Sequence, residues 1–168
     1  ICGRVCTHPC ESRCRRGSVD EAMNICELKR FATDWAYAQG FPYDEDLKPQ
    51  ADIDKRVAII GAGPSGLTCG YYLARLGYHV DIYEAERRAG GVMTYGIPDY
   101  RLPLNILERE IGTIERAGVN IILNTKIGVD VSFRSLQKNY DAIFIAIGAQ
   151  KTLRLGIPGE DLEGVYHG

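Results

Sequence analysis

A short apolar run leads directly into a glycine-rich turn at the centre of this chain. Residues 57–60 read Val-Ala-Ile-Ile, and the turn reads Gly61-Ala-Gly63-Pro64-Ser65-Gly66. An apolar run of this length predicts a buried strand, and the pattern after the turn predicts a helix that ends at Gly77. A strand, a G-x-G-x-x-G turn and a helix in this order predict the first βαβ unit of a dinucleotide-binding fold.

Each glycine of this turn has its own task. Gly61 permits the tight turn, Gly63 lets a pyrophosphate approach the backbone, and Gly66 lets the helix pack closely on the strand. The first helical residues, Pro64 and Ser65, stand where unpaired N–H groups and a partial positive charge attract phosphate. The alternative is a glycine turn that only packs.

The end of the second predicted strand, at residues 79–84, bears on which dinucleotide binds. Glu84, followed by Ala85, stands where an acidic side chain accepts hydrogen bonds from a ribose diol. A carboxylate there repels a ribose 2′-phosphate, which disfavours NADP and leaves FAD and NAD. Arg87 and Arg88 follow in a loop, where we expect them to be solvated.

The remaining pattern alternates between helix and strand. Residues 104–117 carry apolar side chains at helical spacing, and residues 119–123 and 141–147 are rich in β-branched residues. We therefore predict the α/β class, with a Rossmann-like, doubly wound parallel sheet in an incomplete dinucleotide-binding domain at residues 57–168.

Five of the six cysteines lie near the start of the chain, at Cys2, Cys6, Cys10, Cys14 and Cys26. A secreted disulfide scaffold spreads its cysteines over the loops that it staples, so this crowding favours metal binding in a reducing cytoplasm. The first four are evenly spaced, unlike the paired knuckles of structural zinc sites. Four thiolates can hold a [4Fe–4S] cluster, and one cysteine run can serve two clusters.

We predict that residues 1–40 form a small helical iron–sulfur segment. Residues 1–17 have no strand or helix period and predict a loop around the metal group. Ser18 and Glu21 match a capping box, which predicts the start of a helix that ends at Gly40. Its expected apolar face consists of Ile25, Leu28, Ala32 and Trp35. Residues 41–56 are polar, contain two prolines and predict a linker.

Charge and hydropathy exclude several classes of protein. The chain has 20 Lys and Arg against 22 Asp and Glu, so no basic field favours nucleic acid or an anionic membrane. Its longest apolar run, residues 142–147, is too short to span a bilayer, and no signal-peptide pattern opens the sequence. These features predict a cytoplasmic protein. The absence of an initiator Met predicts a piece of a longer protein.

Residues 90–103 are rich in glycine and proline, and they resemble the second flavin-contact segment of the glutamate synthase small-subunit family. This family includes the flavin subunit of NADH-dependent ferredoxin:NADP oxidoreductase and the N-terminal part of dihydropyrimidine dehydrogenase. The similarity covers almost the whole chain. It extends through residues 2–6, 10–17, 28–31, 118–121, 124–128, 146–149 and 157–161.

The resemblance implies that the first glycine motif binds FAD. It also implies that an NAD(P)H-binding domain, outside this chain, is inserted after a segment similar to residues 146–168, and that the chain then returns to complete the FAD site. The further flavin contacts that it implies are Gly91, Val92, Gly96, Ile97, Arg101, Ala146 and Gly148.

The resemblance also implies that Cys6, Cys10 and Cys14 are cluster ligands, with Cys2 as a further candidate. Relatives carry two clusters, whose other cysteines lie upstream of residue 1. In several relatives a Glu or Gln on the following helix completes one cluster, but the matching position here is Lys29. The candidates for the last ligand are therefore Cys2, Cys26 and Glu27.

The function implied is that of an electron-transfer oxidoreductase module. NAD(P)H exchanges hydride with FAD, and electrons then pass through the clusters to or from a partner subunit or domain. No set of acid–base or nucleophilic catalytic residues is expected. The alternatives are a docking module that binds zinc, and an NAD-linked dehydrogenase domain without flavin.

Overall fold

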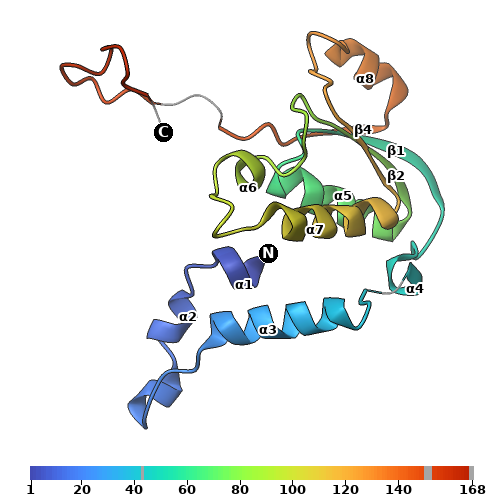
Figure 1. Cartoon of the computed structure of the whole chain (residues 1–168). Helices are drawn as coiled ribbons and strands as arrows, with labels where there is room; N and C mark the ends of the chain where they lie inside the picture. Colours follow the sequence, from blue (N-terminus) through green and yellow to red (C-terminus); the bar gives the residue numbers. More distant parts are fainter. Residues whose placement is uncertain (43, 150–152, 167–168) are drawn as a thin grey trace.

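The computed structural model describes residues 1–42, 44–149 and 153–166 (Figure 1). A parallel sheet contains the strands β1 (Ile53–Ile60), β2 (Tyr78–Tyr83), β3 (Val119–Ile122) and β4 (Ala142–Ile145) in the order β3-β2-β1-β4. Strands that are parallel need crossover connections, and helices supply them here. The predicted α/β, Rossmann-like fold is confirmed.

Helices lie on both sides of the sheet. Helix α5 (Pro64–Leu76) contacts β1, β2 and β3, and α7 (Leu104–Arg116) packs beside it on β3. The short helix α6 (Val92–Tyr95) contacts α7. Helix α8 (Phe133–Asn139) packs against β4, away from α5 and α7 (Figure 1). This arrangement is doubly wound.

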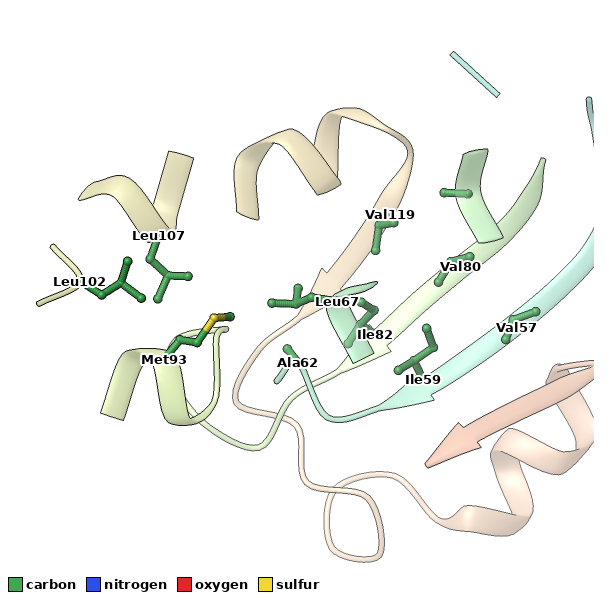
Figure 2. Packing of buried hydrophobic residues seen from close by; sticks show 11 residues of the cluster. Val57, Ile59, Ala62, Leu67, Val80, Ile82, Met93, Leu102, Leu107 and Val119 are labelled. Carbon is green, nitrogen blue, oxygen red and sulfur yellow. The ribbon is translucent and has the colours of Figure 1, made fainter. Parts of the chain in front are cut away.

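The core lies between the sheet and the helices α5 and α7 (Figure 2). Ile59 of β1 and Ile82 of β2 are fully buried and are register partners in the sheet. Leu67 of α5 lies beside them, and Leu107 of α7 groups with Met93 and Leu102 at the other end of the same cluster (Figure 2). Burial of a large aliphatic side chain stabilises the fold by about 1.5–3 kcal/mol, so this layer holds the end of β1 firmly in place.

The N-terminal segment is more helical than predicted. It contains α1 (Cys2–Val5), α2 (Pro9–Ser12), the 3-10 helix η1 (Arg15–Ser18) and α3 (Ile25–Ala38). The prediction of a loop at residues 1–17 was wrong, because four-residue helices are too short to show a period. The capping box was also wrong, since the Ser18 hydroxyl donates to the Arg15 carbonyl and α3 begins at Ile25.

Helix α3 turns a different face inward from the one predicted. Leu28 and Trp35 of the expected apolar face are 52% and 56% exposed. Cys26 is buried instead, against α1. Ile1 and Val5, at the two ends of α1, pack on the core of the α/β domain, so α1 lies between α3 and that domain.

In the predicted linker, residues 44–56 are docked rather than extended away from the domain. Helix α4 (Asp44–Leu47) contacts α7, and Leu47 is buried. The Gln50 N–H donates to the Arg75 carbonyl at 2.8 Å, and β1 begins at Ile53, four residues before the predicted strand. Among the described residues, no helix is long and apolar enough to cross a bilayer.

Candidate functional site

The turn between β1 and α5 has the backbone geometry that its three glycines require. Gly61 has a φ of +106°, and a Cβ there would lie 2.4 Å from the Ala146 carbonyl oxygen. A Cβ on Gly66 would lie 2.0 Å from the Gly61 carbonyl oxygen. A Cβ on Gly63, in contrast, would have no described atom within 4 Å. Gly63 is therefore the point at which the turn is open to a ligand.

Helix α5 begins at this opening. Gly63 is its N-cap, no side chain caps it, and its first backbone bond runs from the Leu67 N–H to the Gly63 carbonyl. Pro64 and Ser65 are exposed at its first turn. Uncapped N–H groups at a helix N-terminus, together with the helix dipole, form a binding site for phosphate.

Glu84 follows β2 at the same edge of the sheet. Its carboxylate accepts hydrogen bonds from the Ala62 N–H at 2.7 Å and from the Glu86 N–H at 2.9 Å. These bonds hold one carboxylate beside the glycine turn, and the adjacent Ala85 is exposed. Each oxygen retains a lone pair that can accept from a hydroxyl group.

The segment after β2 folds back onto the glycine turn. The Gly90 N–H donates to the Ala62 carbonyl at 2.8 Å, and a Cβ on Gly91 would lie 2.9 Å from the Gly63 Cα. Gly91 begins α6, with Val92 as its first residue, 61% exposed. Gly90, with a φ of +117°, was not among the predicted site residues. The sequence signal for it was the Gly90-Gly91 pair itself, because two adjacent glycines let backbone segments come close together.

The segment after β4 approaches the turn from the other side. The Ala146 N–H donates to the Ile60 carbonyl at 2.8 Å, and Gly148 follows with a φ of +68°. The predicted residues Gly61, Glu84, Gly91 and Ala146 therefore meet at the carboxyl ends of parallel strands, where open α/β sheets bind ligands. Residues 150–152 and 167–168 of the predicted segment 146–168 lie outside the described residues.

Three predicted contacts lie further along the chain, in the turns that lead from α6 to α7. The Gly96 and Ile97 N–H groups donate to the Val92 carbonyl, and the Arg101 N–H donates to the Pro98 carbonyl. Arg101 is exposed. These bonds close local turns, so the position of these residues depends on α6.

Arg87 and Arg88 line a cavity of about 220 Å³ between their loop, α7 and β3. Its other lining residues are mostly aliphatic, with Glu108 and Glu115 of α7 among them. Both arginines are exposed, as expected for loop residues.

The four evenly spaced cysteines lie on the short N-terminal helices and at their ends. Cys2 begins α1, Cys6 ends it, Cys10 lies in α2, and Cys14 is the N-cap of η1. All six cysteines of the chain are free thiols. Among the described residues, no three His, Cys, Asp or Glu side chains are grouped to hold a metal ion. The ligand assignment therefore stays a prediction.

Backbone N–H groups point at two of these sulfur atoms. The His8 N–H donates to Cys6 Sγ at 3.3 Å, and the Met23 N–H donates to Cys14 Sγ at 3.5 Å. The bond from Met23 is the main reason why the pKa of the Cys14 thiol is lowered. A lowered pKa favours the thiolate, which is the form that binds metal.

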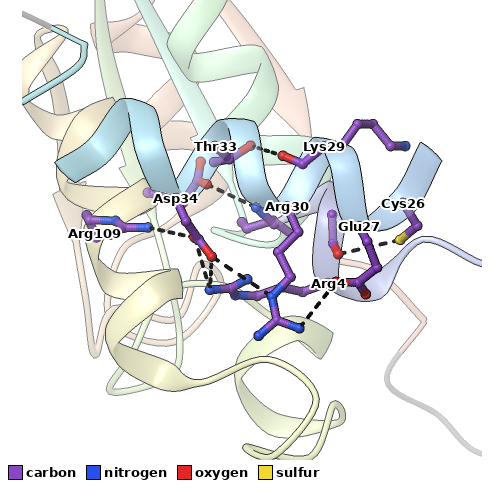
Figure 3. Close-up of polar contacts among 11 residues, drawn as sticks. Arg4, Cys26, Glu27, Lys29, Arg30, Thr33, Asp34 and Arg109 are labelled. Atoms are coloured by element: carbon purple, nitrogen blue, oxygen red, sulfur yellow. Dashed lines mark hydrogen bonds and ion pairs between the residues drawn. The ribbon is translucent and has the colours of Figure 1, made fainter. Parts of the chain in front are cut away.

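Cys26, a candidate for the last ligand, lies in the contact between α1 and α3. It is buried, and its Sγ donates to the Gly3 carbonyl at 3.5 Å. Its N–H donates to the Glu11 carboxylate at 2.7 Å, so Glu11 caps the start of α3. Glu27, the other candidate on this helix, is exposed and lies 3.8 Å from Arg30 (Figure 3).

Two family descriptions match the two parts of the chain. Residues 59–106 match a family described as an NAD(P)-binding Rossmann-like domain. Residues 1–41 match one described as dihydropyrimidine dehydrogenase domain II, 4Fe-4S cluster.

Curated relatives cover nearly all of the chain. It is 48% identical to the NADPH-Fe(3+) oxidoreductase subunit beta of Geobacter sulfurreducens over 96% of its length. It is 38% identical to the glutamate synthase [NADPH] small chain of Bacillus subtilis over 98% of its length. Over the residues it spans, the predicted resemblance to the glutamate synthase small-subunit family is confirmed. It spans 24% of the first relative and 33% of the second.

A solved structure of an oxidoreductase, FprA, is similar to the chain in fold and sequence. Mycobacterium tuberculosis FprA in complex with NADPH has a TM-score of 0.59 and 28% sequence identity to the chain. The match covers 66% of this chain and 26% of FprA.

Proposed function

We propose that this chain forms the first half of an FAD site and an adjoining iron–sulfur segment, in an oxidoreductase that passes electrons between NAD(P)H and a partner subunit. The observation that carries the proposal is the open backbone at Gly63, beside an uncapped helix and a fixed carboxylate at Glu84.

The residues at this edge of the sheet fit a dinucleotide. A pyrophosphate can reach the backbone at Gly63 without meeting a side chain, and the start of α5 offers it N–H groups. Glu84 would accept hydrogen bonds from the ribose diol. Gly91 and Ala146 bring the neighbouring backbone close to the turn on either side.

We propose FAD rather than NADP for two reasons. The Glu84 carboxylate would repel a 2′-phosphate. The Gly90–Gly91 segment also packs on the glycine turn, in line with its resemblance to a second flavin-contact segment. A nicotinamide dinucleotide is the second candidate, since the family description for residues 59–106 names NAD(P).

The protein's part in this chemistry is to bind and to orient. A bound flavin would supply the conversion between hydride and single-electron transfer. The start of α5 would hold the phosphates, and Glu84 would hold the ribose. The proposed nicotinamide site and the partner subunit lie outside this chain, and we place the whole protein in the cytoplasm.

For the iron–sulfur segment we propose Cys6, Cys10 and Cys14 as cluster ligands, with Cys2 as the fourth candidate. Cysteines outside this chain would complete two clusters. The match of residues 1–41 to a 4Fe-4S domain and the N–H groups that point at Cys6 and Cys14 support this assignment.

Cofactor analysis of the full-length protein, purified without oxygen, tests the proposal. We expect released FAD, together with iron and acid-labile sulfide. A protein that contains zinc and no flavin would contradict it, and a protein that releases only a nicotinamide dinucleotide would favour the second candidate.

A matched pair of cysteine variants tests the ligands. Cys10→Ser removes an exposed thiol and is expected to lower the iron content without unfolding the protein. Cys26→Ala removes a buried sulfur atom, and we expect it to keep the iron while stability falls by about 1 kcal/mol. The reverse pattern would identify Cys26 as the ligand.

A further inference from the structure

Three arginine side chains from three helices converge on one carboxylate, that of Asp34 on α3 (Figure 3). Arg4 of α1 donates from one guanidinium nitrogen to both Asp34 oxygens at 3.0 Å. Arg109 of α7 lies 3.9 Å from the Asp34 carboxylate, and so does Arg30 of α3. Asp34 is thus the point where α1, α3 and α7 meet.

Positive charge exceeds negative charge at this point. Three guanidinium groups surround Asp34, and Glu27 adds a second carboxylate only near Arg30, at 3.8 Å. Without the Asp34 charge, Arg4 and Arg109 would face each other as like charges. The contact between the N-terminal segment and α7 would then change from attraction to repulsion.

Arg4, and to a smaller extent Arg109, depend on this carboxylate because they are partly removed from water. The Arg4 side chain is 12% exposed, and the Nε atoms of Arg4 and Arg109 are buried without a hydrogen-bond partner in the structure. The Arg109 guanidinium also lies 3.7 Å from the centre of the Tyr37 ring. A buried cation that loses its counter-charge has a strong tendency to move toward water.

Arg4 shares a helix with the first cysteines, so a shift of this helix would move them. Arg4 lies on α1 between Cys2 and Cys6, and this helix is tightly packed on α3 at Gly3. On the other side of the contact, α7 begins at Leu104, directly after the segment that folds against the glycine turn. Asp34 therefore joins the cysteine-bearing helix to the helix that follows the proposed flavin site.

We propose that Asp34 is a positioning residue, which holds the iron–sulfur segment on α7 at the separation that electron transfer between flavin and cluster requires. This inference rests on the proposed function. With flavin and clusters bound, oxidation of one NAD(P)H to NAD(P)⁺ and a proton would supply two electrons, enough to reduce two clusters by one electron each.

Rapid mixing of the anaerobic full-length enzyme with NADPH or NADH tests the proposal, because flavin reduction and cluster reduction are followed separately. In Asp34→Asn we expect flavin reduction at the wild-type rate and cluster reduction roughly tenfold slower, as for a small displacement of reacting groups. Asp34→Glu, which keeps the carboxylate, is expected to recover most of the rate.

Asp20→Asn is the matched control. Asp20 also pairs with an arginine of the N-terminal segment, Arg16, but both lie exposed in one short stretch and join no separate elements. This variant is expected to transfer electrons like the wild type. Cluster reduction at the wild-type rate in Asp34→Asn, or an equal loss in Asp20→Asn, would overturn the proposal.

If Asp34→Asn loses its clusters, Arg109→Gln decides the question. This substitution removes the guanidinium group that α7 contributes, and it leaves the Arg4–Asp34 pair intact within the N-terminal segment. Slow cluster reduction with full cofactor content supports the proposal, and a wild-type rate overturns it. Failure of the proposed function can be told apart from failure of the Asp34 proposal, because the wild-type enzyme itself would then lack flavin or iron.

Discussion

At the scale of single residues, two glycines of the β1–α5 turn have different roles, one in folding and one in ligand binding. The position of a Cβ on Gly66 is occupied by the Gly61 carbonyl oxygen, while the space beside Gly63 is open. Gly66 therefore serves the packing of helix on strand, and Gly63 serves the approach of a ligand.

Two alanine substitutions test this separation. Gly66→Ala is expected to lower the free energy of unfolding by about 1–3 kcal/mol, because the helix must shift away from the strand. Gly63→Ala, at a φ of −76°, should change it by less than about 1 kcal/mol. It should nevertheless lower the affinity for FAD, as measured by rebinding to the flavin-free protein. Unchanged FAD affinity in Gly63→Ala would contradict the assigned site.

Asp81 on β2 is the centre of a polar cluster on the face of the sheet opposite the core. Its carboxylate accepts hydrogen bonds from Tyr140 at 2.7 Å, Asn120 at 2.7 Å and Arg56 at 3.0 Å. Burial alone would raise the pKa of Asp81, but these bonds outweigh it and lower the pKa. The ionised form therefore stabilises the folded protein.

The stability that Asp81 contributes should depend on pH. Because its pKa is lowered on folding, the contribution is complete above the unfolded pKa of about 3.9 and is lost as the pH falls through the folded pKa. Asp81→Asn is expected to cost about 1.5–3 kcal/mol at neutral pH in urea unfolding. The difference from the wild type should shrink in acid, and a difference independent of pH would contradict the assignment.

At the scale of elements, the contact between α1 and α3 places the first two cysteines. A Cβ on Gly3 would lie 2.6 Å from the Arg30 backbone nitrogen, so the helices touch through their backbones. Glu11, between the other two cysteines, caps α3 through the Cys26 N–H. Helix α3 is thus the support on which the cysteine segment is arranged.

Gly3→Ala should push α1 away from α3. We expect a loss of stability of about 1–3 kcal/mol, together with loss of iron from the full-length protein. Gly17→Ala is the matched control in the same segment, because its Cβ would meet nothing closer than 3.8 Å. Equal iron content and melting temperature in the two variants would show that the close contact does not support the cluster segment.

Only some of the helices and strands could be predicted from the sequence. The strand, glycine turn and helix at residues 57–77 have a local pattern, and the structure confirms them, with Gly77 as the C-cap at a φ of +102°. The start of α3 could not be predicted, because Glu11 caps it from fourteen residues before Ile25. Its inward face is set by contacts with α1, which no local period reveals.

The candidate site could also be predicted only in part. The glycine turn and Glu84 follow from spacing, and the approach of residues 90–91 was expected from the family resemblance. The Asp34 cluster was not predicted, since Arg4, Asp34 and Arg109 are distant in sequence and each resembles an ordinary surface charge.

At the scale of the whole molecule, the N-terminal segment is packed on the same side of the sheet as α5 and α7 (Figure 1). Ile1 and Val5 contact the core of the α/β domain, and Arg4 and Asp34 join α7. The two parts therefore form one surface, on which a cluster and a flavin would be held in a fixed relation.

The central claim is that electrons pass between a dinucleotide at the glycine turn and clusters on the N-terminal segment. Low-temperature electron paramagnetic resonance of the anaerobic full-length protein, before and after addition of NADPH or NADH, tests it most directly. The account predicts that the signal of a reduced iron–sulfur cluster arises in the wild type and is weakened in Gly63→Ala at equal iron content. A protein in which neither nicotinamide reduces a cluster, or in which Gly63→Ala gives the full signal, would contradict it.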